Sequence, residues 1–261
     1  SLAWQTGRRF SLRWSIYDAV ARWYEKTDGL PALLGARVQP LGHQLYAARR
    51  VLLDRVPRYI LSDEVGLGKT IEAGLVIQSL AHVDPTMRVL VIAPGSMSRQ
   101  WLCELYLRFG ARPYVHIDAS RAVQESPMEL LKLVHSDRLI VSTTALERYP
   151  SLKLLLASRK WGLVVVDEAH HYTSESPNFS FLQQLSRQSY GFLALSATPS
   201  KREKASLLAL LSLIAPDTYD SGDLKTFELQ FEIQERVWEE LERTKNYIRT
   251  AIEENGILEL D

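Results

Sequence analysis

A glycine-rich loop followed by lysine and threonine is the strongest chemical signal in the sequence. The stretch 60–74 reads I-L-S-D-E-V-G-L-G-K-T-I-E-A-G. A short apolar strand is predicted at 59–61, before the loop, and a helix-forming run follows at 71–80. A strand, a glycine loop and a helix in this order are typical of a phosphate-binding loop. Because Gly66 and Gly68 lack a Cβ atom, backbone N–H groups can approach phosphate oxygens there.

The residues after the loop can complete a nucleotide site. Unpaired N–H groups at the start of a helix attract phosphate. Lys69 can reach the β- and γ-phosphates, and the Thr70 hydroxyl can bind Mg²⁺. The strict form of such a loop has glycine where this chain has Asp63, so an ordinary glycine-rich turn is the competing interpretation. The loop therefore predicts ATP and Mg²⁺ as ligands.

A pair of carboxylates, Asp167 and Glu168, directly follows four apolar residues at 163–166. Asp167 can hold Mg²⁺ opposite the Thr70 hydroxyl, and Glu168 can orient and deprotonate the water that attacks the γ-phosphate. The alternative is a surface acidic pair that caps a helix. Together with the glycine loop, the pair favours a site that hydrolyses ATP.

Two histidines, His170 and His171, stand beside these carboxylates. They suggest a metal site, but adjacent residues do not share one helical face. We therefore expect His170 to hydrogen-bond to the strand end at 196–198 instead.

Predicted strands alternate with helical segments along most of the chain. The strands lie at 59–61, 89–92, 114–117, 139–141, 163–166 and 192–195, and the helices at 41–53, 71–80, 98–109, 128–134, 201–213 and 227–252. This alternation predicts an α/β fold, a mostly parallel sheet with helices on both faces. Ligands of such sheets bind at the carboxyl edge of the strands. The polar segments 69–70, 143–144, 167–168 and 196–198 should therefore line one rim.

Composition sets wider limits. The 261 residues carry no net charge, so charge alone does not indicate a nucleic-acid partner. The single cysteine, Cys103, excludes an intrachain disulfide and a zinc site built from several cysteines. We expect a reduced, cytoplasmic compartment and no membrane, since no apolar run reaches the length of a membrane span. The sequence starts at Ser1, and we expect it to be part of a longer protein.

Four motifs carry a family resemblance. In order, the sequence contains D-E-V-G-L-G-K-T, A-P-G-S-M-S-R-Q-W, V-V-D-E-A-H-H and L-S-A-T-P, which resemble motifs I, Ia, II and III of superfamily 2 helicases. They look most similar to the Swi/Snf-type translocases of double-stranded DNA. G-H-Q-L-Y-A-A, I-E-A-G and the second His of D-E-A-H-H resemble the bacterial RapA-like branch. The resemblance implies a RecA-like P-loop lobe, and it accommodates Asp63, because the family normally has Asp there.

The resemblance also implies residue roles. Gln44 would read the adenine, and the phosphate loop would comprise Gly66, Leu67, Gly68, Lys69 and Thr70. Thr70 and Asp167 would hold Mg²⁺, and Lys69, Asp167 and Glu168 would be catalytic. Coupling of nucleotide state to DNA grip would fall to His170, Ser196, Ala197 and Thr198. The DNA backbone would be contacted by Pro94, Gly95, Ser96, Ser98, Thr143 and Thr144.

These interpretations divide the chain into three parts. Residues 1–37 form an N-terminal helical extension, 38–216 a RecA-like ATP-binding lobe, and 217–261 an acidic helical segment leading to a second lobe that this sequence lacks. An apolar stripe at 12–24 is expected to pack on the lobe, with a partner-binding face as the alternative.

The predicted function is ATP-driven movement along duplex DNA, or remodelling of protein–DNA complexes, in the cytoplasm at the nucleoid. RNA polymerase or another protein complex is the expected partner. The isolated fragment should be nearly inactive, because it lacks the second lobe's arginine finger. The alternatives are a strand-separating DNA or RNA helicase and a nucleotide-dependent scaffold without turnover.

Overall fold

The computed structural model describes residues 30–33, 36–62, 68–120, 127–197 and 204–255. The predicted helix at 12–24 lies outside these ranges. So do loop residues Gly66 and Leu67, as well as Thr198 at the end of the L-S-A-T-P motif.

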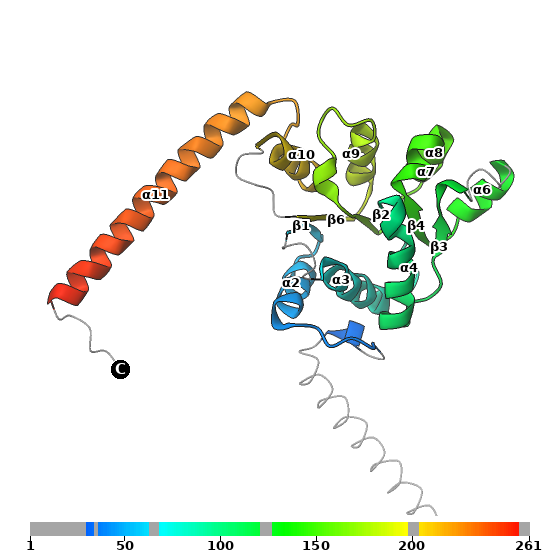
Figure 1. The fold of residues 1–261 in the computed structure, drawn as a ribbon, viewed down its shortest axis with the longest axis horizontal. Coiled ribbons are helices and arrows are strands. Elements are labelled where there is room, and N and C mark those ends of the chain that lie inside the picture. The colour runs from blue at the N-terminus through cyan, green and yellow to red at the C-terminus, as the bar shows by residue number, and fades with distance from the viewer. Residues whose placement is uncertain (1–29, 34–35, 63–67, 121–126, 198–203, 256–261) are drawn as a thin grey trace, which may run out of the picture.

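The described chain is built around a parallel six-stranded sheet (Figure 1). Its strands are β1 (Arg58–Ser62), β2 (Val89–Ala93), β3 (Val115–Ile117), β4 (Arg138–Ser142), β5 (Leu163–Val166) and β6 (Gly191–Ser196). Their spatial order is β1-β6-β5-β2-β4-β3. β2, β4, β5 and β6 are buried along their whole length, as expected for strands covered on both faces. The predicted α/β fold with a mostly parallel sheet is confirmed.

Helices cover both faces of this sheet, which separates two hydrophobic cores. One face carries α2 (Gly42–Leu53), α3 (Lys69–Val83) and α4 (Gly95–Phe109), and the other carries α6 (Pro127–Val134), α7 (Thr143–Arg148), α8 (Pro150–Ala157), α9 (Phe179–Gln188) and α10 (Lys204–Ile214). The two-residue period of a strand explains the division. In β2, Val89 and Val91 pack with α3 and α4, while Leu90 and Ile92 pack on the opposite side.

Three of these helices were not predicted from the sequence. α7 and α8 lie in the stretch between β4 and β5, and α9 lies between β5 and β6. Pro150 occupies the start of α8, where proline favours helix initiation, so a usable signal was present. The predicted helices at 41–53, 71–80, 98–109, 128–134 and 201–213 correspond to α2, α3, α4, α6 and α10.

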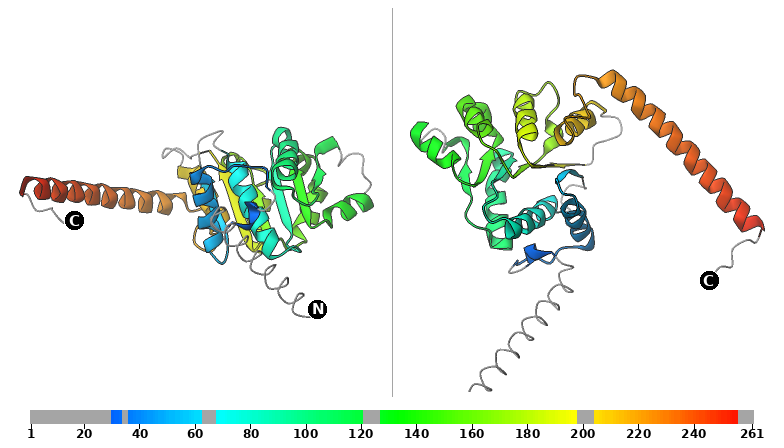
Figure 2. Two further views of the ribbon diagram at one scale, coloured as in Figure 1. Left: turned by 90° about the horizontal axis from the view of Figure 1, so that it is seen from below. Right: turned by 180° about the vertical axis from the view of Figure 1, so that it is seen from behind.

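The two ends of the described chain behave differently. A 3-10 turn at Pro31–Leu33 packs on α3, with Leu30 and Ala32 buried in the core on that face. Part of the predicted N-terminal extension therefore contributes to the core of the lobe. At the other end, α11 (Leu224–Asn255) projects away from the sheet as a long helix (Figures 1 and 2). None of the described helices is long and apolar enough to cross a membrane.

Candidate functional site

The described end of the glycine loop lies against α2. Gly68 adopts a left-handed backbone conformation with φ 93°, which favours glycine. A Cβ atom at this position would collide with the side-chain amide nitrogen of Gln44. The Gln44 side chain is buried, and its Oε1 accepts a hydrogen bond from the Leu41 backbone N–H at 3.0 Å. The fold therefore places Gln44 directly beside the loop, although their separation in sequence gave only a weak signal.

The next two residues open helix α3. Lys69 is its first residue, and Lys69 and Thr70 are both partly buried. The Ile71 backbone N–H bonds to the Gly68 carbonyl at 2.7 Å, so the turn is closed at the predicted phosphate-binding end. Lys69 also exerts an electrostatic effect on Asp167, which shows that the start of α3 and the end of β5 converge.

Asp167 is a buried carboxylate with both oxygens engaged. Its Oδ2 accepts a hydrogen bond from the Trp101 indole N–H at 2.8 Å, and its Oδ1 accepts one from the Glu168 backbone N–H at 2.9 Å. Burial raises the pKa of Asp167, because water no longer stabilises its charge. The two hydrogen bonds and the positive charge of Lys69 oppose this rise, whereas the charge of Glu168 adds to it.

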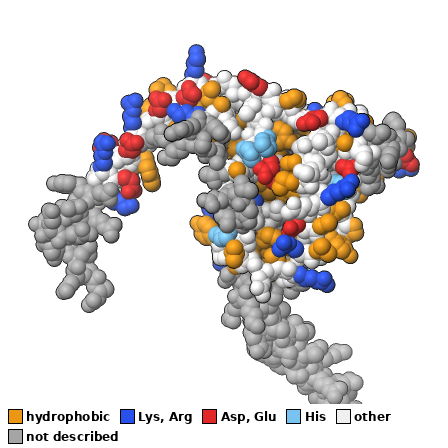
Figure 3. All heavy atoms as spheres, viewed as in Figure 1, with side chains coloured by type: hydrophobic (Ala, Val, Ile, Leu, Met, Phe, Trp, Pro, Cys, Tyr) orange, Lys and Arg blue, Asp and Glu red, His pale blue; other side chains and the backbone are white. Residues whose placement is uncertain are grey.

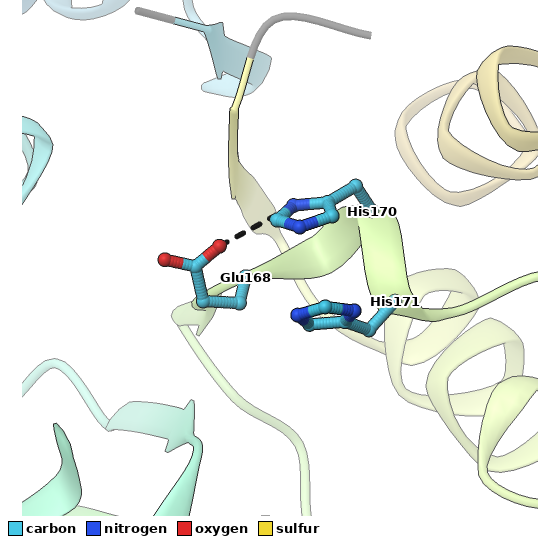
Figure 4. Close-up of side chains that lie close together, drawn as sticks. All are labelled: Glu168, His170 and His171. Carbon is cyan, nitrogen blue, oxygen red and sulfur yellow. Dashed lines mark ion pairs between the residues drawn. The ribbon is translucent and has the colours of Figure 1, made fainter. Parts of the chain in front are cut away.

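Glu168 is the only non-glycine residue with positive φ in the described ranges. Its φ of 49° and ψ of 43° place it in the left-handed region, which costs free energy for a residue with a side chain. Such backbone strain clusters at functional sites, where the surroundings hold it in place. The Glu168 Oε2 atom lies 3.3 Å from the His170 Nδ1 atom (Figure 4).

The two histidines lie close to each other and to Glu168. The ring of His170 lies beside the Glu168 carboxylate. The hydrogen bond expected from His170 to the strand end at 196–198 stays a prediction, because Thr198 lies outside the described residues. His170 and His171 lie in a 3-10 turn, Ala169–His171, and their ring centroids are 4.2 Å apart. The argument from α-helical faces was wrong, because a short 3-10 turn does not follow α-helical spacing.

The first turns of α4 and α7 meet at the same edge of the sheet. A Cβ atom at Gly95 would come within 3.0 Å of the Thr144 hydroxyl oxygen, so the two segments are in close contact. Ser96 and Thr144 are exposed, and Pro94 and Thr143 are partly exposed. These residues were predicted from distant positions in the sequence, and the fold brings them together.

Ser98 does not belong to that exposed set. Its side chain is fully buried, its hydroxyl donates to the Gly95 carbonyl at 3.0 Å, and it also lies 3.0 Å from His116 Nε2. The predicted contact between Ser98 and a DNA backbone is therefore wrong for this conformation, because the Ser98 side chain is buried and its hydroxyl is hydrogen-bonded within the protein.

Ser196 ends β6 in register with Ser62 of β1. Its side chain is buried, and its hydroxyl donates to the Ala197 carbonyl at 2.6 Å. The L-S-A-T-P segment thus starts at the carboxyl edge, as predicted, but the described residues show no direct contact between Ser196 and Glu168.

A pocket of about 230 Å³ opens beside the carboxylates. Its lining residues are Pro94, Thr143, Glu147, Asp167, Glu168, His171, Tyr172, Ser176, Pro177 and Asn178. The pocket joins the ends of β2, β4 and β5. Lys69, Gln44 and Ser196 reach the same edge of the sheet without lining it.

Two residues near the carboxylates were not predicted as site residues from the sequence. Trp101 holds Asp167 across 66 positions of sequence, a pairing that no local pattern reveals. Tyr172 is buried in the pocket wall, and burial, followed by the charges of Glu147 and Asp167, raises the pKa of its hydroxyl. The presence of Trp101 in the quoted A-P-G-S-M-S-R-Q-W motif was the one available signal.

The residues present fit a nucleotide with Mg²⁺. Asp167 offers carboxylate oxygens and Thr70 a hydroxyl, the hard oxygen donors that Mg²⁺ prefers. The buried charge of Asp167, with its raised pKa, is an environment that a nearby cation would stabilise. The left-handed Gly68 and the start of α3 would provide backbone N–H groups for a phosphate.

Comparison with known proteins agrees with this geometry. The family described as SNF2-related domain matches residues 42–254. RNA polymerase-associated protein RapA from Pseudomonas savastanoi pv. phaseolicola is 35% identical over 234 residues, covering 85% of this chain and 23% of that protein. RapA from Pseudomonas fluorescens is 35% identical over 242 residues, covering 88% and 24%. The chain thus spans about a quarter of the length of these relatives.

Solved structures show the same fold. The Sulfolobus solfataricus SWI2/SNF2 ATPase core in complex with double-stranded DNA superposes with a TM-score of 0.58 at 20% identity, over 73% of this chain and 39% of that one. The Pyrococcus furiosus Hef helicase domain gives a TM-score of 0.55 at 18% identity, over 68% and 36%. The chain therefore belongs to the SNF2-related family and has the RecA-like α/β fold of Swi/Snf-type cores, and its sequence is similar to that of RapA.

Proposed function

We propose that this lobe binds and hydrolyses ATP to drive movement along duplex DNA, together with a second lobe supplied by the longer protein. The observation that carries the proposal is the pair Asp167 and Glu168. Asp167 is buried and held by two hydrogen bonds, while Glu168 is kept in a strained conformation with its carboxylate at a pocket. In the proposal, the buried carboxylate would hold a cation and the next carboxylate, which lines the pocket, would act on the attacking water.

The proposed roles follow from position. Gly68 and the start of α3 would hold the phosphates, with Lys69 providing positive charge. Asp167 and Thr70 would hold Mg²⁺, which when bound neutralises phosphate charge. Glu168 would orient the attacking water and accept its proton. Gln44, packed beside Gly68, would offer an amide donor and acceptor to the adenine.

Gly66 and Leu67 of the phosphate loop, and Thr198 of the coupling segment, lie outside the described residues, so their roles rest on the motifs alone. For the described Ser196 and Ala197, coupling is proposed from their place at the end of β6, beside β5 and its carboxylates.

The DNA substrate is proposed from the relatives and from the exposed first turns of α4 and α7. The similar Sulfolobus core was solved in complex with double-stranded DNA. Ser96 and Thr144 are exposed there, although the Thr144 hydroxyl also lies 3.0 Å from the Ser142 hydroxyl, and hydroxyl groups can contact backbone phosphates without reading sequence. The relatives' name, RNA polymerase-associated protein, suggests RNA polymerase as a protein partner. A bacterial enzyme with these partners would act in the cytoplasm, at the nucleoid.

The test uses the longer protein, with its downstream region, and measures ATP turnover without nucleic acid, with duplex DNA and with single strands. We expect stimulation by duplex DNA. Stronger stimulation by single strands would favour a strand-separating helicase, and ATP binding without turnover would favour a scaffold.

A matched variant, Glu168→Gln, should bind ATP normally and lose turnover, because an amide cannot accept the proton from the attacking water. Normal turnover by this variant would remove Glu168 from its role.

A further inference from the structure

One carboxylate oxygen and two imidazole nitrogens lie close together in the structure, on Glu168, His170 and His171. The ligand atoms that these side chains offer all lie within 4.8 Å of one another (Figure 4). A tetrahedral Zn²⁺ ion with bonds of about 2.1 Å holds its ligand atoms about 3.4 Å apart. To share one ion, the side chains would have to move closer by up to about 1.4 Å, from 4.8 Å to about 3.4 Å.

The backbone explains why the three groups converge. Glu168 directly precedes the 3-10 turn Ala169–His171 in a left-handed conformation, and the ring centroids of His170 and His171 lie 4.2 Å apart. The His171 backbone N–H bonds to the Glu168 carbonyl at 3.1 Å and closes this turn. Ala169 is fully buried, and the Ser206 hydroxyl donates to the His170 carbonyl at 3.4 Å. The cluster therefore stands on a turn fixed to the core.

We propose that these three residues form a binding site for a divalent transition metal of the Zn²⁺ type. Two imidazoles and one carboxylate are a donor set that suits Zn²⁺, whereas Mg²⁺ prefers oxygen ligands alone. The site is reachable from solvent, since His171 is exposed and the Glu168 and His170 side chains are 22% and 25% exposed. Figure 3 shows histidine and acidic side chains together on one face of the molecule.

The consequence rests on the proposed function of Glu168. A metal bound through the Glu168 carboxylate withdraws it from the attacking water, while Lys69 and Thr70 stay available for the nucleotide. Zn²⁺ should therefore inhibit ATP turnover without preventing ATP binding.

The binding test uses the 261-residue chain with Cys103→Ser, because the exposed Cys103 thiol is itself a zinc ligand. Zn²⁺ affinity is measured by competition with a coloured chelator, and Co²⁺ reports its coordination by visible absorption. His171→Ala should weaken Zn²⁺ binding at least about tenfold, since even outer partners of ligands contribute that much. His135→Ala removes an exposed histidine at the turn after α6 and should leave the affinity unchanged.

Equal Zn²⁺ affinity in the parent and His171→Ala would overturn the proposal. His171→Gln, with circular dichroism on each variant, guards against a loss caused by misfolding.

A second measurement separates the metal site from the proposed function. In the longer protein, turnover with Zn²⁺ divided by turnover without it is compared between the parent and His171→Ala. We expect the inhibitory Zn²⁺ concentration to rise at least about tenfold in the variant, in step with affinity. Zn²⁺ binding at the site with no effect on turnover would support the metal site and contradict the role of Glu168.

Discussion

The hydrogen bond from Trp101 to Asp167 offers the sharpest test of the site. Trp101→Phe removes the indole N–H that reaches Asp167 Oδ2 at 2.8 Å and keeps an aromatic ring in the core. Both side chains are buried, so no water replaces the lost donor easily. The variant should therefore lower the free energy of unfolding, because the Asp167 carboxylate loses a hydrogen-bond donor. The size of this loss should depend on pH, because Asp167 is charged only above its pKa.

The magnitude follows from the charge. A hydrogen bond to an ionised group contributes about 1.5–3 kcal/mol, against about 0.5–1.5 kcal/mol for a neutral pair. Burial already raises the pKa of Asp167 above its ordinary value of 3.8, and losing the Trp101 donor raises it further. A raised carboxyl pKa in the folded state means that stability falls as pH rises through the window between the unfolded and folded values. The charge-dependent part of the cost is thus complete at neutral pH and disappears on acidification.

The assay is urea unfolding followed by circular dichroism, at about pH 7.5 and near the ordinary aspartate pKa of about 4. Trp161→Phe is the matched control, because the Trp161 side chain is also buried and donates to a neutral group, the Leu156 carbonyl, at 3.0 Å. The loss of unfolding free energy caused by Trp161→Phe should be the same at both pH values, because the Leu156 carbonyl does not titrate. If Trp101→Phe cost the same at both pH values, or no more than Trp161→Phe at neutral pH, the buried charge of Asp167 would not be what Trp101 stabilises.

Further predictions concern the loop, the DNA and the isolated chain. Lys69→Ala should abolish detectable Mg-ATP binding with the fold intact, and an unchanged ATP dissociation constant in calorimetry would contradict its role. Gly68→Ala should lower the free energy of unfolding by more than Gly110→Ala. Both glycines have positive φ, which costs an alanine about 1–2 kcal/mol, but only at Gly68 would the added Cβ atom also collide with a neighbouring side chain. The urea midpoints of the two variants measure the difference. DNA affinity should fall steeply as the salt concentration rises and should not depend on the DNA sequence. Competition between duplexes of different sequence at fixed salt tests the second expectation. The 261-residue chain should hydrolyse ATP hardly at all, since no described residue lining the pocket is arginine and an arginine finger contributes about 10³–10⁵ in rate. Turnover by this chain equal to that of the longer protein with duplex DNA would place the arginine finger within this chain.

The sequence by itself determined the fold class and the motifs that define the site. Runs such as Leu163–Val166 are apolar at every position, which is the local signature of a strand buried on both faces. Polar residues directly after such strands must gather at one edge once the sheet is parallel, so Asp167 and Thr143 could be grouped without coordinates. Both now line one pocket.

Short helices were harder to foresee. α7 spans only six residues and α8 eight, too few for a periodic pattern to be distinguished from a loop.

The tertiary structure alone decided which polar groups are exposed and which partners they meet. Ser98 and Ser96 are two residues apart in one motif, yet the turn of α4 buries the first and exposes the second. The link between Trp101 and Asp167 lay beyond sequence reasoning, and the cluster of Glu168 with two histidines was considered from the sequence but set aside. The first depends on how α4 packs on the sheet, and the second on a left-handed residue followed by a 3-10 turn. Sequence periodicity reports local backbone geometry, whereas these contacts are set by packing between segments and by one strained residue.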